Sequence, residues 1–294
     1  MKQLTIFTPT YNRAHTLPAC YASLKRQRNQ DFKWLIIDDG STDGTQALVE
    51  AWQQEQLIHI DYVRQSNQGM HGAHNTAYDR INTELNVCLD SDDFMPPDAV
   101  EKILSFWNQH GSDQYSGLVG LNTNTKGDLI GTKWPAHLKA SSLFDLYYKH
   151  GVTGDKKLVY RTELTRQYPY PLFENERYVG LAYKYYQLDR DYELLLMDET
   201  LCCVEYLADG SSRNMLFQYR KNPQGFSFYR KALMKLPFAT RAFQFRQAIH
   251  YVSSSFMSRN RAFIQETPRK ALTIMALPLG TVLFWYIKMK TRVT

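Results

Sequence analysis

The chain alternates short apolar runs with segments of helical spacing, and this alternation restricts its fold more than any other feature. The apolar runs are residues 3–7, 33–38, 57–63 and 85–89, and the helical segments that follow them are 16–27, 41–55, 72–81 and 97–110. The first run is expected to end at Pro9. Alternation of strands and helices is typical of a mostly parallel sheet that is covered on both faces. We therefore predict an α/β fold with a Rossmann-like, mostly parallel sheet flanked by helices.

Each predicted strand leads into a turn rich in polar residues; these turns are residues 8–13, 38–45, 64–75 and 90–93. Ligands of open parallel sheets bind outside the carboxyl ends of the strands, so we expect the four turns to contribute to one site. Asp38 and Asp39 end the second strand, and Gly40 permits a tight turn beside them. A carboxylate held there can accept a hydrogen bond from an N–H group of a ligand. A nicotinamide dehydrogenase is excluded, because no G-x-G-x-x-G follows the first strand.

The fourth turn begins a segment crowded with carboxylates: Asp90, Asp92, Asp93 and Asp98. Like charges this close repel one another unless a cation or solvent offsets them. Asp90 and Asp92 lie on the same side of an extended segment, and such an oxygen pair suits Mg²⁺ or Mn²⁺. Asp98 follows Pro97 in a first helical turn, where it favours the helix dipole. Asp93 is either a third ligand or a cap of that helix, and the structural role is favoured.

Three of these segments resemble the nucleotide-sugar motifs of the family 2 glycosyltransferases, which share the GT-A fold: "TPTYNR", "IIDDGSTDGT" and "CLDSDDFMPPD". The resemblance extends over roughly residues 4–209. It implies a hexosyltransferase-type enzyme that transfers a sugar from a UDP-sugar with inversion, aided by Mn²⁺ or Mg²⁺. Its acceptor would be lipid-linked or a polysaccharide, in the synthesis of a cell-surface polysaccharide such as a capsule or exopolysaccharide.

The resemblance also assigns roles to single residues. Asp39 would accept from the uracil N3–H, and Asp92 would ligate the metal. A structural role stays equally open for His71 and for Asn75. The residues expected to contact the nucleotide sugar are Thr8, Pro9, Tyr11, Asp39, Asn67, Gly69, His71, Asn75, Asp90 and Ser91.

The catalytic base is where the sequence departs from the family pattern. Gly180 and Leu181 stand where many relatives have an acid. Inversion needs a carboxylate that takes the proton of the acceptor hydroxyl. The nearest acids are Glu174 and Glu176, and Glu176 is favoured because it lies closer to the next predicted helix. The alternative is that both are ordinary surface glutamates.

Two further residues are expected on the acceptor side of the site. The segment "GVTGDKKLVYR" resembles the loop with which the family covers that side. Its candidates for contact with the acceptor or the diphosphate are Asp155 and Lys156.

The C-terminal part of the chain differs in charge from the rest. Residues 213–294 hold fifteen Lys and Arg but a single acid, Glu266, although the net charge of the whole chain is only +6. We predict a transferase domain at 1–210, with a nucleotide-binding half at 1–100 and an acceptor half at 101–210. A helical, basic and aromatic extension follows at 211–294. The difference in charge between the two parts of the chain indicates what the protein binds rather than how it folds.

The uncharged run 271–287 is short for a spanning helix and contains Pro278 and Gly280. We expect a monotopic anchor that lies in or dips into one leaflet, with its basic flanks on anionic headgroups. The alternative is a helix that packs on the body or on a second copy of the chain. Nucleic acid is disfavoured, since no nucleic-acid-binding motif is found.

These features lead to an expected location at the cytoplasmic face of the cell membrane. The N-terminus has no apolar stretch of signal-peptide type. The four cysteines show no paired metal-ligand spacing and are expected to be buried thiols in a reducing compartment. One alternative function stays open, a catalytically weak nucleotide-sugar-binding partner of another transferase.

Overall fold

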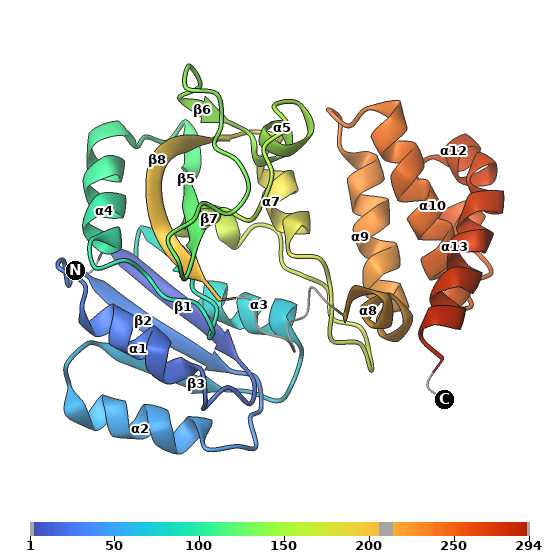
Figure 1. Cartoon of the computed structure of the whole chain (residues 1–294). Coiled ribbons are helices and arrows are strands. Elements are labelled where there is room, and N and C mark those ends of the chain that lie inside the picture. The colour runs from blue at the N-terminus through green and yellow to red at the C-terminus, as the bar shows by residue number, and fades with distance from the viewer. Residues whose placement is uncertain (1–2, 206–213, 293–294) are drawn as a thin grey trace. The chain divides into compact units, whose positions relative to one another are not determined.

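A computed structural model describes residues 3–205 and 214–292 and divides the chain into two compact units (Figure 1). Unit 1 consists of residues 1–169 and 191–207, and unit 2 of residues 170–190 and 208–294. The division departs from the predicted boundary at residue 210, because 170–190 belongs with the C-terminal helices. The connection between the units at 206–213 lies outside the described residues.

Unit 1 is built on one eight-stranded sheet. In spatial order the strands are β3 (Ile60–Arg64), β2 (Phe32–Asp38), β1 (Leu4–Thr10), β4 (Leu85–Cys88), β7 (Lys157–Arg161), β5 (Tyr115–Asn124), β8 (Glu193–Val204) and β6 (Ala140–Ser141). The pairs β3–β2, β2–β1, β1–β4 and β5–β8 are parallel, whereas β7 and β6 run antiparallel to their neighbours. The predicted α/β fold with a mostly parallel sheet is confirmed.

Helices cover both faces of this sheet, as the alternation of strand and helix predicts. The helices of unit 1 are α1 (Leu17–Lys25), α2 (Thr45–Glu55), α3 (Met70–Arg80), α4 (Ala99–His110), α5 (Leu143–Tyr148) and α6 (Thr162–Thr165). On one face, Trp34 of β2 stacks with Tyr21 of α1 and Trp52 of α2. On the other, Phe7 of β1 meets the rings of His74 and Tyr78 of α3 edge-on. The main core therefore lies between the first face and α1, α2 and α4.

Strand β1 continues through Pro9 to Thr10, so the predicted end of the strand at Pro9 is wrong. The ladder between β1 and β4 ends at the pair Phe7–Cys88, with Leu89 N–H donating to the Phe7 carbonyl. In a parallel strand, Phe7 and Pro9 direct their backbone polar groups toward the same neighbour. At Pro9 that neighbour has already left the sheet, so the missing N–H costs no ladder hydrogen bond.

Unit 2 is helical within its described residues. Its helices are α7 (Ala182–Leu188), α8 (Met215–Lys221), α9 (Pro223–Lys235), α10 (Arg241–Met257), α11 (Phe263–Glu266), α12 (Lys270–Met275) and α13 (Leu277–Lys290). Its core forms around α10, where Tyr251 and Val252 pack with Met234 of α9 and with Ala276 between α12 and α13. Within residues 3–205 and 214–292, no helix has both the length and the apolar character that crossing a membrane requires.

One titratable group of unit 2 links its stability to pH. His250 of α10 lies with its ring centroid 5.8 Å from that of Tyr219 of α8. Burial, and then the positive charges of Arg230 and Arg246, lower the pKa of His250 to about 3. The unfolded chain takes up a proton at this position as the pH falls below about 6.5. Because the folded protein does not, stability is present above about pH 6.5 and is lost as the pH falls toward 3.

We therefore expect His250→Gln to reduce the acid sensitivity of unit 2. Thermal unfolding followed by far-ultraviolet circular dichroism should show a smaller loss of stability between pH 6.5 and 4 than in the wild-type protein. His59→Gln is the control, because His59 is exposed on unit 1. An unchanged pH profile in His250→Gln would contradict the assignment.

Candidate active site

The turns that follow β1, β2, β3 and β4 meet at one edge of the sheet, as the sequence predicts. All four strands run in the same direction. Their registers place Thr10 beside Asp38, and Asp38 beside Arg64. This edge therefore brings together the turns that contain most of the residues predicted to bind a nucleotide sugar.

Asp39 holds two of these turns together. Its carboxylate accepts hydrogen bonds from Gln65 Nε2 (2.8 Å), from the backbone N–H of Gln68 (2.8 Å) and from that of Gly69 (2.7 Å). The backbone N–H of Asp39 donates to the Thr10 carbonyl at 2.8 Å, which attaches the end of β1 as well. Asp39 is buried and lies where α3 begins, a favourable place for a negative charge. Its predicted contact with uracil stays a prediction.

The turn after β2 is also bonded to the turn after β1. The N–H of Asn12 donates to Ser41 Oγ at 2.9 Å, and Asn12 Oδ1 accepts from the N–H of Thr42 at 2.8 Å. Gly40 has φ of +87°, and a side chain there would come within 3.2 Å of the backbone at Gln65 and Asn67. The conformation at position 40 therefore favours glycine, and the close approach of the next turn leaves little space for a side chain.

The residues predicted from the turn after β1 differ in accessibility. Thr8 is fully buried, and its Oγ1 accepts from Trp34 Nε1 at 2.9 Å, so its side chain serves the core. Pro9 is buried as well, whereas Tyr11 is 48% exposed. Of these three side chains, Tyr11 is the one that solvent reaches freely.

The turn after β3 leads into the predicted residues of α3. Asn67 is partly buried, and Gly69 has φ of +82° at the start of the helix. His71 is buried and Asn75 partly buried. The sequence analysis did not single out His74, whose Nδ1 lies 3.2 Å from Tyr78 Oη and whose Nε2 lies 3.7 Å from Cys88 Sγ.

The carboxylates of the turn after β4 face different surroundings. The Asp93 N–H donates to the Asp90 carbonyl at 3.0 Å and so closes the turn. Asp93 and Ser91 are buried, whereas Asp90 and Asp92 are partly accessible. The Asp93 carboxylate lies 3.7 Å from the Lys157 ammonium and accepts from Cys202 Sγ at 3.5 Å. Asp93 therefore has a structural role, but it pairs with a buried lysine and does not cap α4 as predicted; the N-cap of α4 is Asp98.

Lys157 was missed in the sequence analysis. Because β7 runs antiparallel to β4, the first residue of β7 lies beside the carboxyl end of β4. There Lys157 Nζ also donates to the Cys88 carbonyl at 3.1 Å. The available signal was the pair "KK" directly before an apolar strand, but only the pairing of β7 with β4 gives it meaning.

The electrostatics of this pair follow from its burial. Burial raises the pKa of Asp93 to about 7, and the nearby Lys157 opposes that rise. Burial alone would lower the pKa of Lys157, but Cys202, Asp93 and Asp90 together raise it above its ordinary value. The raised pKa of Asp93 favours a neutral carboxyl, whereas the raised pKa of Lys157 is the shift expected beside a charged carboxylate. We favour the ion pair of ammonium and carboxylate, because the Lys157 ammonium has both the Asp93 carboxylate and the Cys88 carbonyl as acceptors.

The two residues predicted on the acceptor side differ in exposure. Asp155 is exposed, whereas Lys156 is buried. Lys156 Nζ donates to three backbone carbonyls, those of Thr153 (2.7 Å), Ile130 (3.2 Å) and Gly154 (3.2 Å). Burial lowers the pKa of Lys156, and the charge of Asp155 opposes this. Lys156 thus joins two loops of unit 1, while its predicted contact with a substrate stays a prediction.

Glu176, the predicted general base, belongs to unit 2 and is buried there. Its two carboxylate oxygens accept from the backbone N–H groups of Gln224 (2.9 Å) and Gly225 (2.8 Å), in the first turn of α9. Glu176 is therefore not the surface glutamate that the alternative assumed, and it satisfies two N–H groups that a helix start leaves without helical partners. Glu174 is exposed. The catalytic role of Glu176 stays a prediction beside this structural one.

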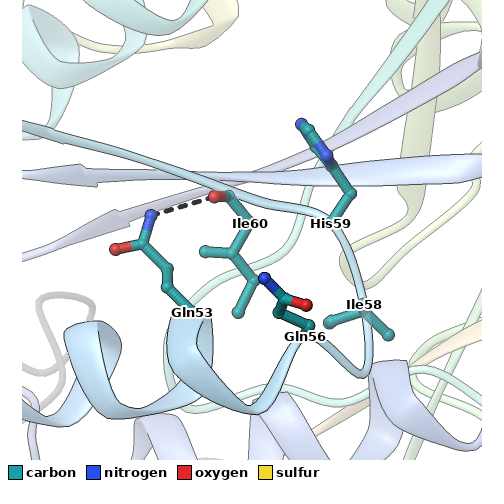
Figure 2. Close-up of a pocket in the computed structure, with 5 residues that line it drawn as sticks. All are labelled: Gln53, Gln56, Ile58, His59 and Ile60. Atoms are coloured by element: carbon teal, nitrogen blue, oxygen red, sulfur yellow. Dashed lines mark hydrogen bonds between the residues drawn. The ribbon is translucent and has the colours of Figure 1, made fainter.

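A surface hollow lies away from the site, at the opposite edge of the sheet (Figure 2). It is formed where α2 ends and β3 begins, and Gln53 Nε2 donates there to the Ile60 carbonyl at 3.0 Å. The amino end of β3 lies opposite the carboxyl ends that form the candidate site. The hollow is lined by Gln53, Gln56, Ile58, His59 and Ile60.

The described residues contain no group of three or more His, Cys, Asp or Glu arranged to hold a metal ion. Asp93 faces Lys157, whereas Asp90 and Asp92 are the partly accessible carboxylates of this turn. Two carboxylates suit a hard divalent ion that takes its other ligands from substrate phosphates and water. The donor set therefore fits an ion that binds together with a diphosphate.

We expect Lys157→Met to destabilise unit 1 by about 3–5 kcal/mol, because it leaves the buried Asp93 without its cation. Urea unfolding can be followed by the fluorescence of Trp34, Trp52 and Trp107, which are all buried in unit 1. Lys126→Met at an exposed lysine is the matched control. A loss below about 1 kcal/mol would show that the pair contributes little.

Glu176→Gln should destabilise unit 2 by about 1–3 kcal/mol, because one of two backbone N–H groups would then face an amide NH₂. Hydrogen exchange at the first turn of α9, read by mass spectrometry, measures the loss locally. Glu174→Gln removes the same charge at an exposed position and should leave this exchange unchanged. Equal effects of the two substitutions would argue against the capping role.

Comparison with known proteins places this geometry in a family. A model of glycosyl transferase family 2 matches residues 5–168. The chain is 33% identical over 138 residues to a chondroitin synthase of Escherichia coli, covering 46% of this chain and 20% of that protein. It is 32% identical over 104 residues to TuaG of Bacillus subtilis, a putative teichuronic acid biosynthesis glycosyltransferase, covering 35% and 41% of the two chains. The chain thus spans less than half of either relative.

Solved structures resemble the fold over nearly the whole chain. TarS 1-349 of S. aureus, in complex with UDP-GlcNAc, aligns with a TM-score of 0.63 at 17% identity and covers 95% of this chain and 80% of that one. The mannosyltransferase PcManGT of Pyrobaculum calidifontis, with GDP-Man and Mn²⁺, aligns at 0.56 and 16% identity, covering 97% and 88%. These likenesses agree with a GT-A fold. The match to the family model covers more than half of the residues, and the chain belongs to glycosyl transferase family 2.

Proposed function

We propose that the protein transfers a sugar from a UDP-sugar, with inversion, to a lipid-linked or polysaccharide acceptor in the synthesis of a cell-surface polysaccharide. The observation that carries this proposal is the arrangement at the end of β4. Asp93 is directed into the sheet toward Lys157, which leaves Asp90 and Asp92 partly accessible beside the turns that Asp39 connects. Relatives named for chondroitin and teichuronic acid support the class of product.

The turns at the sheet edge would bind the nucleotide. Tyr11 offers an exposed ring against which a base or ribose can pack. Asp39 would accept from the N3–H of the uracil, since a carboxylate offers about four lone-pair sites. The segment 65–69 is held by that carboxylate, so the nucleotide would meet a preformed turn. Preorganised contacts of this kind reduce the entropic cost of binding.

Asp90 and Asp92 would hold Mn²⁺ or Mg²⁺ together with the donor diphosphate. The ion, when bound, would neutralise negative charge on the departing diphosphate. Lys157 determines which carboxylate of the turn is directed away from the diphosphate, because it engages Asp93 and the carbonyl of Cys88 from within the sheet. The PcManGT structure, which contains Mn²⁺ and GDP-Man, is consistent with this proposal.

A second function is favoured by one observation. The carboxylate of Glu176 is engaged by α9, so the residue predicted as the base already has a structural partner. A chain without a base would bind nucleotide sugar and assist another transferase. Turnover of labelled UDP-sugars by the purified chain, with and without lipid-linked acceptor, separates the two functions. Binding without turnover under every condition would favour the second.

The metal assignment is tested by Asp92→Asn, which keeps the shape of the side chain and removes its charge. We expect donor turnover in Mn²⁺ to fall by at least about 100-fold, the scale of losing a main electrostatic stabiliser. Asp98→Asn is the matched control, since Asp98 pairs with Lys102 at 3.1 Å and lies at the start of α4. Near wild-type turnover in Asp92→Asn, or full activity in excess EDTA, would contradict the assignment.

A further inference from the structure

The apolar run 271–287 has two sides in the structure. It is divided between α12 and α13, with Ala276 between them. Ala276, Gly280 and Ile287 are buried against the rest of unit 2. A side chain at Gly280 would come within 2.5 Å of Val252 Cβ on α10, so the helices approach closely there. This side of the run is therefore occupied by intramolecular packing.

The opposite side of the same helices is exposed and apolar. Residues 279, 282, 286 and 289 of α13 follow one another at intervals of three and four, which places them in one stripe along that helix, and Met275 ends α12 just before it. Of the thirteen large apolar residues exposed on the described chain, seven belong to α12 and α13. We call these seven the α12–α13 face: Ile274 (53% exposed), Met275 (65%), Leu279 (52%), Val282 (67%), Trp285 (50%), Tyr286 (44%) and Met289 (60%).

Cations lie at both ends of this face, and the acid nearest in sequence is paired with a lysine. Lys270, Lys288 and Lys290 are exposed at its ends, and Lys288 Nζ lies 5.0 Å from the centre of the Trp285 ring. Glu266 is the sole acid of residues 214–292, and its carboxylate pairs with Lys231 at 3.1 Å. An apolar stripe with a positive margin matches a surface that is apolar within and negative at its edge.

We propose that the α12–α13 face binds the surface of an anionic lipid bilayer. The helices would lie along the membrane, with the stripe at the boundary of headgroups and acyl chains and the lysines on anionic headgroups. Trp285 and Tyr286 suit the headgroup level. Insertion of the whole run, which the sequence analysis considered, would require Ala276, Gly280 and Ile287 to leave the bundle. Binding by one face requires no unfolding.

A second copy of the chain is a poorer occupant of this face. A two-fold symmetric dimer would bring the same patch of both copies together. The lysines of one copy would then lie near those of the other, and like charges in an interface are unfavourable. An anionic bilayer instead complements them. The inference does not depend on the proposed reaction, because nucleotide binding belongs to unit 1.

The chain offers an internal probe for this proposal. Of its five tryptophans, Trp34, Trp52, Trp107 and Trp134 are buried, and only Trp285 is exposed. The full chain should be mixed with vesicles of phosphatidylcholine alone, or with 30% phosphatidylglycerol, that carry brominated acyl chains. We expect fluorescence quenching and co-sedimentation with the anionic vesicles, and at least about tenfold weaker binding to the neutral ones. Trp285→Phe should abolish the quenching but not the co-sedimentation.

Variants test whether vesicle binding depends on the α12–α13 face or on nonspecific hydrophobic contact elsewhere on the protein. Val282→Asp should weaken binding to the anionic vesicles at least about tenfold, whereas Leu57→Asp, at a 59% exposed position of unit 1, should not. The double variant Lys288→Glu/Lys290→Glu should reduce binding and its dependence on salt. UDP affinity, measured in parallel, should be the same in all variants.

Three results would overturn the proposal. The first is a full chain that stays in the supernatant with anionic vesicles at low salt. The second is equal loss of binding in Val282→Asp and Leu57→Asp. The third is a dimer in sedimentation equilibrium that Val282→Asp dissociates, without vesicle binding by either form, which would assign the face to a second copy of the chain. Failure to bind UDP would count against the proposed function alone.

Discussion

The buried ion pair between Lys157 and Asp93 determines the arrangement of the candidate site. It connects β7, which runs against the direction of the parallel strands, to the turn that leaves β4. Without the lysine, the carboxylates of this turn would repel one another within one small region. The pair turns Asp93 inward and leaves Asp90 and Asp92 toward solvent. A local sequence rich in acid thus becomes two sets of carboxylates in different surroundings.

Two buried acids of this protein hold backbone N–H groups in place. Asp39 accepts from two N–H groups in the turn where α3 begins, and Glu176 accepts from two N–H groups in the first turn of α9. A carboxylate is well suited to this task, because a helix start presents several N–H groups and a partial positive charge. Asp39 therefore positions the turn that the nucleotide would meet. Glu176 in the same way fixes the segment 170–190 to the C-terminal helices of unit 2.

Unit 2 combines two surfaces that the sequence shows as one apolar run. The buried side of α12 and α13 stabilises the bundle around α10, and the exposed side is available to a partner. A soluble surface normally avoids large contiguous apolar patches, so an exposed stripe of this length needs a physical reason. A transferase whose acceptor is attached to a lipid would gain from such a face, since both would then be held at the same bilayer.

The sequence by itself determined the class of the fold, the order of the first four strands and helices, and the polar turns at the sheet edge. These depend on local periodicity and on the direction of parallel strands, both of which are written in neighbouring residues. Only the tertiary structure decided that Lys157 lies beside Asp93. That contact requires β4 and β7 to pair antiparallel, although Cys88 and Lys157 at their ends are 69 residues apart in the sequence. The tertiary structure likewise decided that Glu176 caps α9 and that 170–190 joins unit 2. Which side of the run 271–287 is buried also follows from packing against α10, and hydropathy alone cannot distinguish two sides that are both apolar.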